Sequence, residues 1–155
     1  MAFLDDDGIP LSLSSASRMT LRSPAVSDGG AMPADYTCDG MGSTLPLTWL
    51  GAPSGVKEFA VLMTTVPGDG TTKYNWALYG IPGTATGLVR DVFAVGTLGV
   101  GSDGPGTVYN PPCSQGPGAK IYTFRVYELS GSPVLSVPAS AVTGPVLAAA
   151  IAPLT

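Results

Sequence analysis

The chain has 155 residues, a length that fits one domain with a sizeable hydrophobic core. Hydrophobic residues make up 45% of it and charged residues only 12%, so extensive disorder is not expected. The net charge is −4 and lysine and arginine do not cluster, which argues against nucleic-acid binding.

Other functional classes are disfavoured by what the sequence lacks. No apolar run approaches the roughly 18 residues that a membrane span needs, and the N-terminus does not have the pattern of a signal peptide. The chain has no histidine and only two cysteines, so we expect neither a metal site nor a cofactor.

In chain order, we expect residues 1–18 to form an N-terminal arm and residues 19–155 to form a single domain. The 21 glycines and 15 prolines favour short strands separated by turns over long helices. Residues 58–65 are apolar on both faces, which predicts a strand buried on both sides. The expected strands cover residues 19–22, 47–50, 58–65, 74–81 and 121–129.

Two further segments complete the predicted fold. Residues 83–107 are rich in glycine and threonine, and we expect a long excursion with one or two weak strands, around 92–95 for example. Pro145 and Pro153 bracket a short helix over residues 146–152. The pattern predicts a mainly antiparallel β-fold with a peripheral C-terminal helix, and by itself leaves a sandwich and a barrel equally open.

Five short motifs, in three groups, follow one another along the chain. Tyr-Thr-Cys-Asp-Gly at 36–40 precedes Pro-Leu-Thr-Trp at 46–49, Asn-Trp follows at 75–76, and Tyr-Asn-Pro-Pro-Cys at 109–113 leads to Gly-Ala-Lys-Ile-Tyr at 118–122. Over residues 19–152 this order resembles the phosphatidylethanolamine-binding protein family, in its bacterial Raf-kinase-inhibitor-like branch. The resemblance implies an antiparallel β-sandwich whose ligand pocket is lined by these segments.

The resemblance also implies that the family's ionisable pocket groups are replaced here. An acidic position maps onto Thr65, one histidine onto Asn75 and the other onto Lys120. The result is a histidine-free site, rich in hydrogen-bond donors and carrying one positive charge, which suits a phosphate, carboxylate or enolate oxygen. With Tyr79 as a further apolar wall, the candidate ligand-binding residues are Thr65, Asn75, Trp76, Asn110, Pro111, Pro112, Ser114, Lys120 and Tyr122.

Each of these residues also has a structural interpretation, which the sequence leaves open. Trp76 and Tyr122 are equally typical of a core, Asn75 of a side chain that satisfies loop backbone, and Lys120 of a solvated surface. Cys38 and Cys113 are either two thiols or a disulfide, and a bridge over that loop would stabilise the chain by roughly 4 kcal/mol.

We therefore predict a small-molecule binding module for an anionic or carbonyl-bearing ligand. One alternative is an enzyme of natural-product assembly, in which Lys120 stabilises an oxyanion and Tyr122 donates a proton. Another is a protein-interaction or inhibitor module that presents the excursion. A homodimer is left open, and the low charge and the cysteine pair favour an exported protein over a cytoplasmic one.

Overall fold

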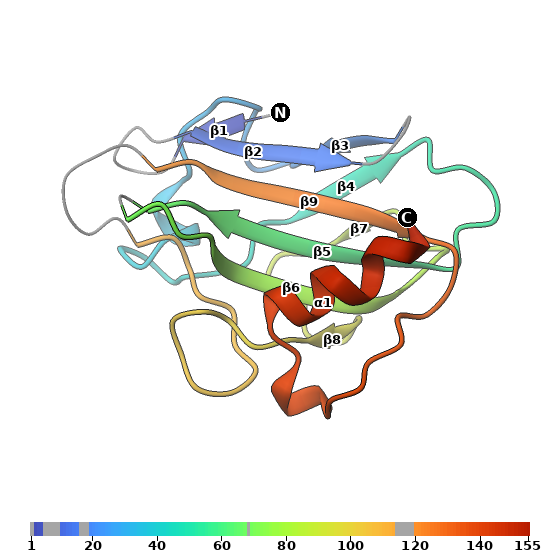
Figure 1. The fold of residues 1–155 in the computed structure, drawn as a ribbon. Helices are drawn as coiled ribbons and strands as arrows, with labels where there is room; N and C mark the ends of the chain where they lie inside the picture. The colour runs from blue at the N-terminus through green and yellow to red at the C-terminus, as the bar shows by residue number, and fades with distance from the viewer. Residues whose placement is uncertain (1, 5–9, 16–18, 68, 114–119) are drawn as a thin grey trace.

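The computed structural model describes residues 2–4, 10–15, 19–67, 69–113 and 120–155, and these form two sheets and one α-helix (Figure 1). The strands of the larger sheet lie in the order β1-β2-β9-β5-β6-β8, and those of the smaller sheet in the order β3-β4-β7. In chain order the strands are β1 (Ala2–Leu4), β2 (Pro10–Ser15), β3 (Thr20–Arg22), β4 (Leu47–Leu50), β5 (Glu58–Thr65), β6 (Lys73–Pro82), β7 (Gly87–Leu88), β8 (Thr97–Leu98) and β9 (Tyr122–Leu129).

Strand β5 lies in the middle of the larger sheet, between β6 and β9, and pairs with both in antiparallel fashion. Its side chains alternate between two apolar environments. Phe59, Val61 and Met63 belong to the core between the sheets, whereas Ala60 and Leu62 belong to a second cluster beneath the helix. The burial of both faces predicted for residues 58–65 is therefore confirmed.

The core between the sheets is anchored by Trp49 of β4. Its indole is 1% exposed and lies 5.2 Å from the Phe59 ring, measured between ring centroids. The indole nitrogen donates to the Ala85 carbonyl oxygen at 2.9 Å. Trp49 thus buries a large apolar surface without leaving its one polar atom unpaired.

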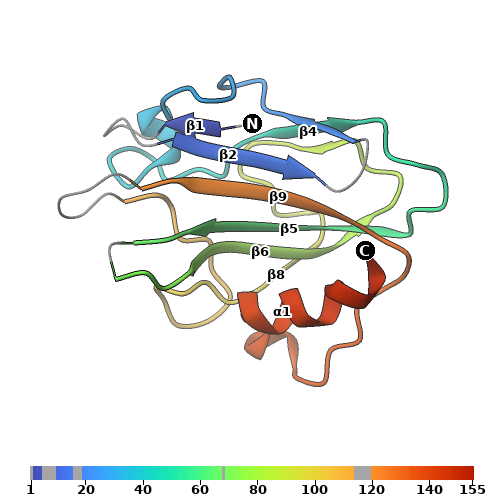
Figure 2. The same ribbon diagram turned by 45° about the horizontal axis from the view of Figure 1, so that its top comes forward.

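Helix α1 (Gly144–Ile151) covers the other face of the larger sheet, opposite the smaller sheet (Figure 2). The Thr143 side chain caps it by accepting from the Val146 amide, and Pro145 lies in the first turn. Leu147 and Ile151 are buried against the sheet. Three short 3-10 turns complete the regular structure: η1 (Ala34–Tyr36), η2 (Ala139–Ala141) and η3 (Ala152–Leu154).

The antiparallel β-sandwich with a short C-terminal helix is confirmed, with the helix displaced by one or two residues from the predicted range. Within the excursion, β7 and β8 have two residues each, and residues 92–95 form no strand. The described parts of the N-terminal segment form β1 and β2. Strand β2 runs parallel to β9 and β1 pairs antiparallel with β2, so both extend the larger sheet.

Candidate functional site

A β-bulge in β6 creates the candidate site. Met63 of β5 pairs with Trp76, but the next residue, Thr64, pairs with Tyr74. Asn75 is therefore an extra residue between two regular pairs. A bulge of this kind redirects the side chain of the extra residue and is common beside functional sites.

The bulge leaves backbone groups of β6 without partners in β5, and a neighbouring loop supplies them. The Asn110 amide donates to the Asn75 carbonyl oxygen at 2.7 Å. In return the Asn75 side-chain amide donates to the Asn110 carbonyl oxygen at 2.9 Å. A Cβ atom on Gly101 would overlap the Asn110 side chain, so a glycine there leaves the space that this side chain occupies. These contacts fix the orientation of Asn75.

Beside the bulge lies a small cavity of about 50 Å³, which we call the Asn75 cavity. Four residues that the sequence places far apart, Thr65, Asn75, Lys120 and Tyr122, line it together. The remaining lining residues are Pro67, Lys73, Asp103, Pro111 and Cys113.

Two polar atoms at the Asn75 cavity are buried without a hydrogen-bond partner among the described residues. They are the Thr65 hydroxyl oxygen and Asn75 Oδ1. Leaving such an atom unpaired costs roughly 1–3 kcal/mol, so buried polar atoms in folded proteins nearly always have a partner. A hydroxyl can donate or accept, whereas an amide oxygen only accepts. The cavity therefore presents hydrogen-bonding capacity that the described residues do not use.

The charged side chains that the structure describes at the cavity are of both signs. Lys73 forms an ion pair with Asp103 at 2.5 Å, and Lys120 adds a second ammonium group. The sequence analysis did not include Lys73 or Asp103. Lys73 precedes Asn75 by two positions on one strand, so strand alternation offered a signal, but nothing in the sequence connects Asp103 to this site.

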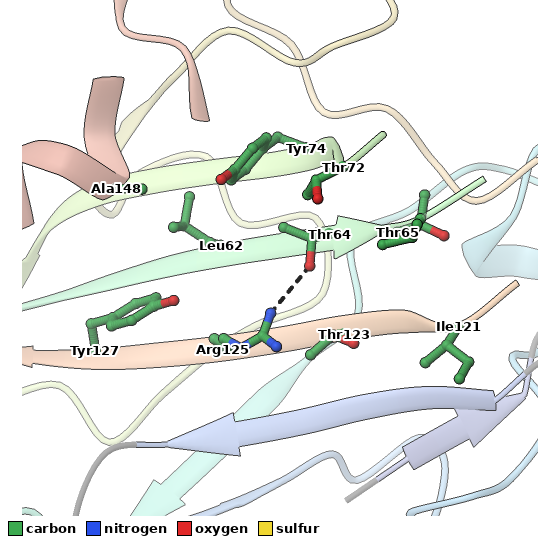
Figure 3. Close-up of a pocket in the computed structure, with 11 residues that line it drawn as sticks. Leu62, Thr64, Thr65, Thr72, Tyr74, Ile121, Thr123, Arg125, Tyr127 and Ala148 are labelled. Carbon is green, nitrogen blue, oxygen red and sulfur yellow. Dashed lines mark hydrogen bonds between the residues drawn. The ribbon is translucent and has the colours of Figure 1, made fainter. Parts of the chain in front are cut away.

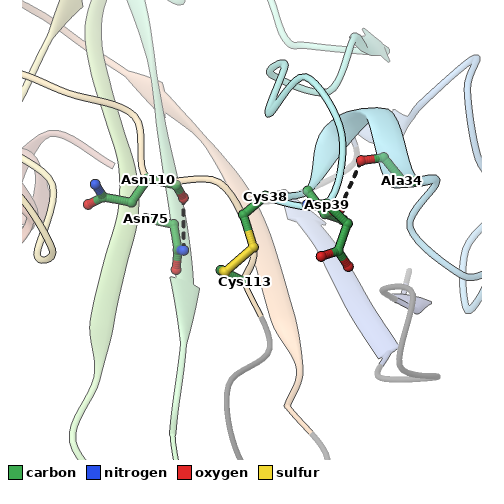
Figure 4. The surroundings of a disulfide bond; sticks show 7 residues. Ala34, Cys38, Asp39, Asn75, Asn110 and Cys113 are labelled. Carbon is green, nitrogen blue, oxygen red and sulfur yellow. Dashed lines mark hydrogen bonds between the residues drawn. A yellow bond between two sulfur atoms is a disulfide. The ribbon is translucent and has the colours of Figure 1, made fainter.

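A disulfide forms part of the cavity wall. The structure joins Cys38 to Cys113, with Cα atoms 5.2 Å apart. Figure 4 shows this bond close to the Asn75 and Asn110 pair. The Cys38 amide also donates to the Pro112 carbonyl oxygen at 2.9 Å. The segment after Asn110 is therefore tied to the loop around residue 38 as well as to β6.

Other predicted site residues lie elsewhere. Trp76 is 1% exposed within the inter-sheet core and lines a different cavity. Pro112 is buried behind the wall, and Asn110 contributes through its backbone carbonyl. Tyr79 belongs to the cluster beneath α1, so its expected role as a pocket wall was wrong. Ser114 lies outside the described residues.

A larger hollow of about 460 Å³ lies on the helix-covered face of the large sheet. Figure 3 shows Arg125 donating to the Thr64 hydroxyl there, with Tyr74 and Tyr127 on either side of Leu62. Thr65 is the one residue that it shares with the Asn75 cavity. We favour the smaller cavity as the candidate site, because the hollow is open and its guanidinium group is exposed.

Two searches of the described residues gave no candidates. No helix there combines the length and the hydropathy of a membrane span. No three or more histidine, cysteine or acidic residues gather there in a way that could bind a metal ion.

A two-sheet sandwich with one covering helix and a polar cavity at a strand end defines a class of folds known from solved structures. A homologue of phosphatidylethanolamine-binding protein, CT736 from Chlamydia trachomatis, superimposes with a TM-score of 0.75 at 25% identity, covering 86% of this chain and 88% of its own. YbcL of Escherichia coli superimposes with a TM-score of 0.78 at 21% identity, covering 90% and 92%.

Sequence comparison identifies the family. The family model for phosphatidylethanolamine-binding protein matches residues 22–152. A UPF0098 protein of Methanothermobacter thermautotrophicus is 34% identical over 116 residues, which span 72% of this chain and 76% of the relative. The lipoprotein LppC of Mycobacterium tuberculosis is 32% identical over 115 residues, 74% of this chain but only 57% of that relative. The chain belongs to the phosphatidylethanolamine-binding protein family.

Proposed function

We propose that this protein is a small-molecule binding module that holds an anionic or oxygen-rich ligand in the Asn75 cavity. The observation that carries the proposal is the pair of buried polar atoms, on Thr65 and Asn75 of the cavity lining, that have no hydrogen-bond partner among the described residues. Lys120 adds positive charge beside them. A bound ligand would supply the missing hydrogen bonds.

The two atoms constrain what that ligand carries. The Thr65 hydroxyl and the Lys120 ammonium group donate to oxygen atoms, which favours a negatively charged group. Asn75 Oδ1, like any amide oxygen, only accepts, and the bond from its amide nitrogen to the Asn110 carbonyl oxygen fixes which end of the amide is which. The best complement is therefore a group with both a charged oxygen and a hydroxyl hydrogen, such as a hydrogen phosphate or a hydroxy acid.

The volume of the cavity limits how much of the ligand it admits. At about 50 Å³, it takes one small polar group rather than a whole drug-sized molecule. The family's name refers to phosphatidylethanolamine, whose head group contains a phosphate. The phosphate of O-phosphoethanolamine and inorganic phosphate are therefore suitable probes, with glycerol as a neutral comparison.

Titration calorimetry on wild type and on Lys120→Ala tests the proposal. We expect both phosphate compounds to bind wild type and glycerol not to bind. Loss of a charge-assisted hydrogen bond is worth about 1.5–3 kcal/mol, so Lys120→Ala should weaken phosphate binding at least tenfold. Lys57→Ala provides the matched control, because Lys57 is exposed and does not line the cavity.

The Thr65→Val variant provides a second test, which leaves the charge of the site unchanged. It keeps the shape of the side chain and removes the unpaired hydroxyl, so phosphate binding should weaken while the folded protein is not destabilised. Equal affinities for phosphate and glycerol in wild type and in all variants would contradict the proposed function. The enzyme and protein-interaction alternatives stay predictions, because no described residue favours them.

A further inference from the structure

A second cavity lies beneath the excursion, against the opposite side of the Asn75–Trp76 peptide. It has a volume of about 160 Å³ and shares no lining residue with the Asn75 cavity. We call it the Trp76 cavity. Its walls are mostly apolar and include Trp76 and Leu78 from β6, Val92 and Val95 from the excursion, and Tyr109.

Aromatic rings give the cavity a defined shape. Trp76 and Tyr109 meet edge to face, with ring centroids 5.5 Å apart. Phe93 also lines the cavity, yet it is 93% exposed, which places it at the mouth.

Hydrogen bonds fix the wall that the excursion provides. Asp91 has a positive φ of 55°, a conformation that few residues other than glycine adopt. Its carboxylate accepts from the Ser43 hydroxyl at 3.0 Å and from the Thr44 amide at 3.3 Å. The strained residue is thus used to tie the segment before Val92 to the segment that carries Thr44. The cavity is built into the fold and does not result from a loose loop.

Two hydroxyl groups of the cavity-lining residues are buried without a partner among the described residues. They belong to Thr44 and Tyr109. Burial raises the pKa of the Tyr109 phenol, and neighbouring Tyr122 and Asp91 raise it further. The phenol therefore keeps its proton at physiological pH and can donate to an acceptor oxygen.

Volume and polarity together indicate the kind of molecule that would fit. An apolar cavity of about 150 Å³ in another protein stays dry and binds benzene, and the Trp76 cavity is of this size. No lysine or arginine is among the described residues that line it. A single ring therefore fits the space, an acceptor oxygen fits the hydroxyls, and a negative charge has no counterpart.

We propose that the Trp76 cavity is a second ligand site, which takes a small neutral ring compound bearing one acceptor oxygen. The aromatic and aliphatic walls bind the ring, and the hydroxyls of Thr44 and Tyr109 recognise the oxygen. This site shares no lining residue with the Asn75 cavity and takes a ligand of a different kind from the one proposed there.

Three probes of similar size separate the contributions of the ring, the acceptor oxygen and a negative charge to binding. They are acetophenone, ethylbenzene and benzoate. Binding to the full chain is followed by NMR through the methyl signals of Leu78, Val92 and Val95. We expect acetophenone to bind, ethylbenzene to bind several-fold more weakly for want of the oxygen, and benzoate not to bind. Saturating inorganic phosphate should not displace acetophenone.

Variants then locate the site. Val92→Phe fills the cavity and should abolish acetophenone binding, whereas Val134→Phe makes the same change at an 88% exposed position and should not. Thr44→Val and Tyr109→Phe should leave ethylbenzene binding intact and remove the preference for acetophenone. The proposal is overturned if acetophenone leaves these methyl signals unmoved, if Val92→Phe binds it as wild type does, or if neither hydroxyl variant loses the preference.

Discussion

At the scale of single residues, both cavities depend on hydroxyl and amide groups that are buried without partners. At the Asn75 cavity these are Thr65 and Asn75, and at the Trp76 cavity they are Thr44 and Tyr109, each without a partner in the part of the chain that the structure describes. Each such atom lowers the stability of the empty protein. Four such atoms belong to residues in the walls of the two cavities, so this loss of stability falls at the places where ligands would enter.

Tyr109 leads to a prediction about alkaline stability. Because burial raises the pKa of its phenol, the folded chain keeps this proton at pH values where the unfolded chain, with a tyrosine pKa near 10, has lost it. The unfolded state then binds fewer protons, so the free energy of unfolding falls as the pH rises above about 10. Below that pH the contribution is complete.

Urea denaturation at a series of pH values, on wild type and Tyr109→Phe, measures this effect. The variant should lose stability less steeply above about pH 10. Burial also raises the pKa of Tyr127, so part of the slope should remain in the variant. Identical slopes in the two proteins would contradict the assignment to Tyr109.

At the scale of the elements, the sequence predicts regular strands well and their irregularities poorly. Residues 47–50 and 58–65 match β4 and β5 because apolar alternation between turn residues is a local signal. The bulge at Asn75 is a property of the register between β5 and β6, which no local pattern contains. The sequence therefore indicates that Asn75 belongs to the site, but not how its side chain is turned.

Strand β2 shows a signal that the analysis of the sequence did not use. Leu11 and Leu13 alternate with serines, a two-residue period typical of a strand with one apolar face. The expectation for residues 1–18 was an arm. The pairing of β2 with β9 depends on a partner more than 100 positions away in the sequence, which only the folded chain brings alongside it.

Helix α1 gives a prediction at this scale. A Cβ atom on Gly144 would overlap the Tyr74 ring, so the start of the helix lies directly against β6. Gly144→Ala should therefore destabilise the protein by about 1–3 kcal/mol through overpacking. Gly131→Ala is the control, since a Cβ there meets nothing within 4 Å. Urea denaturation compares the two variants, and equal stabilities would show that α1 can shift away from the sheet without cost.

At the scale of the whole molecule, the disulfide connects the stability of the fold to the shape of the candidate site. Cys38 and Cys113 are 75 positions apart, and Cys113 lines the Asn75 cavity. The bond therefore restricts the unfolded chain over nearly half its length. It also holds one cavity wall against the loop that contains Cys38.

Reduction should accordingly have two effects. The free energy of unfolding should fall by about 4 kcal/mol, since the chain-entropy model relates the loss to the length of the closed loop. Phosphate affinity should fall as well, even where the reduced protein remains folded, because Pro111 and Cys113 keep their place in the wall partly through this bond. Hydrogen bonds of the wall would remain, among them those from Cys38 to Pro112, between Asn75 and Asn110, and from the Asp103 amide to the Asn110 side chain.

A Cys38→Ser and Cys113→Ser double variant separates these effects from those of the reductant itself. It should resemble reduced wild type in unfolding and in calorimetric phosphate titration, and adding reductant should change neither measurement. If reduction lowers stability but leaves phosphate affinity unchanged, the bond supports the fold without shaping the site. If the intact mass shows free thiols before reduction, the disulfide has no part in either property, and the wall is held by its backbone contacts.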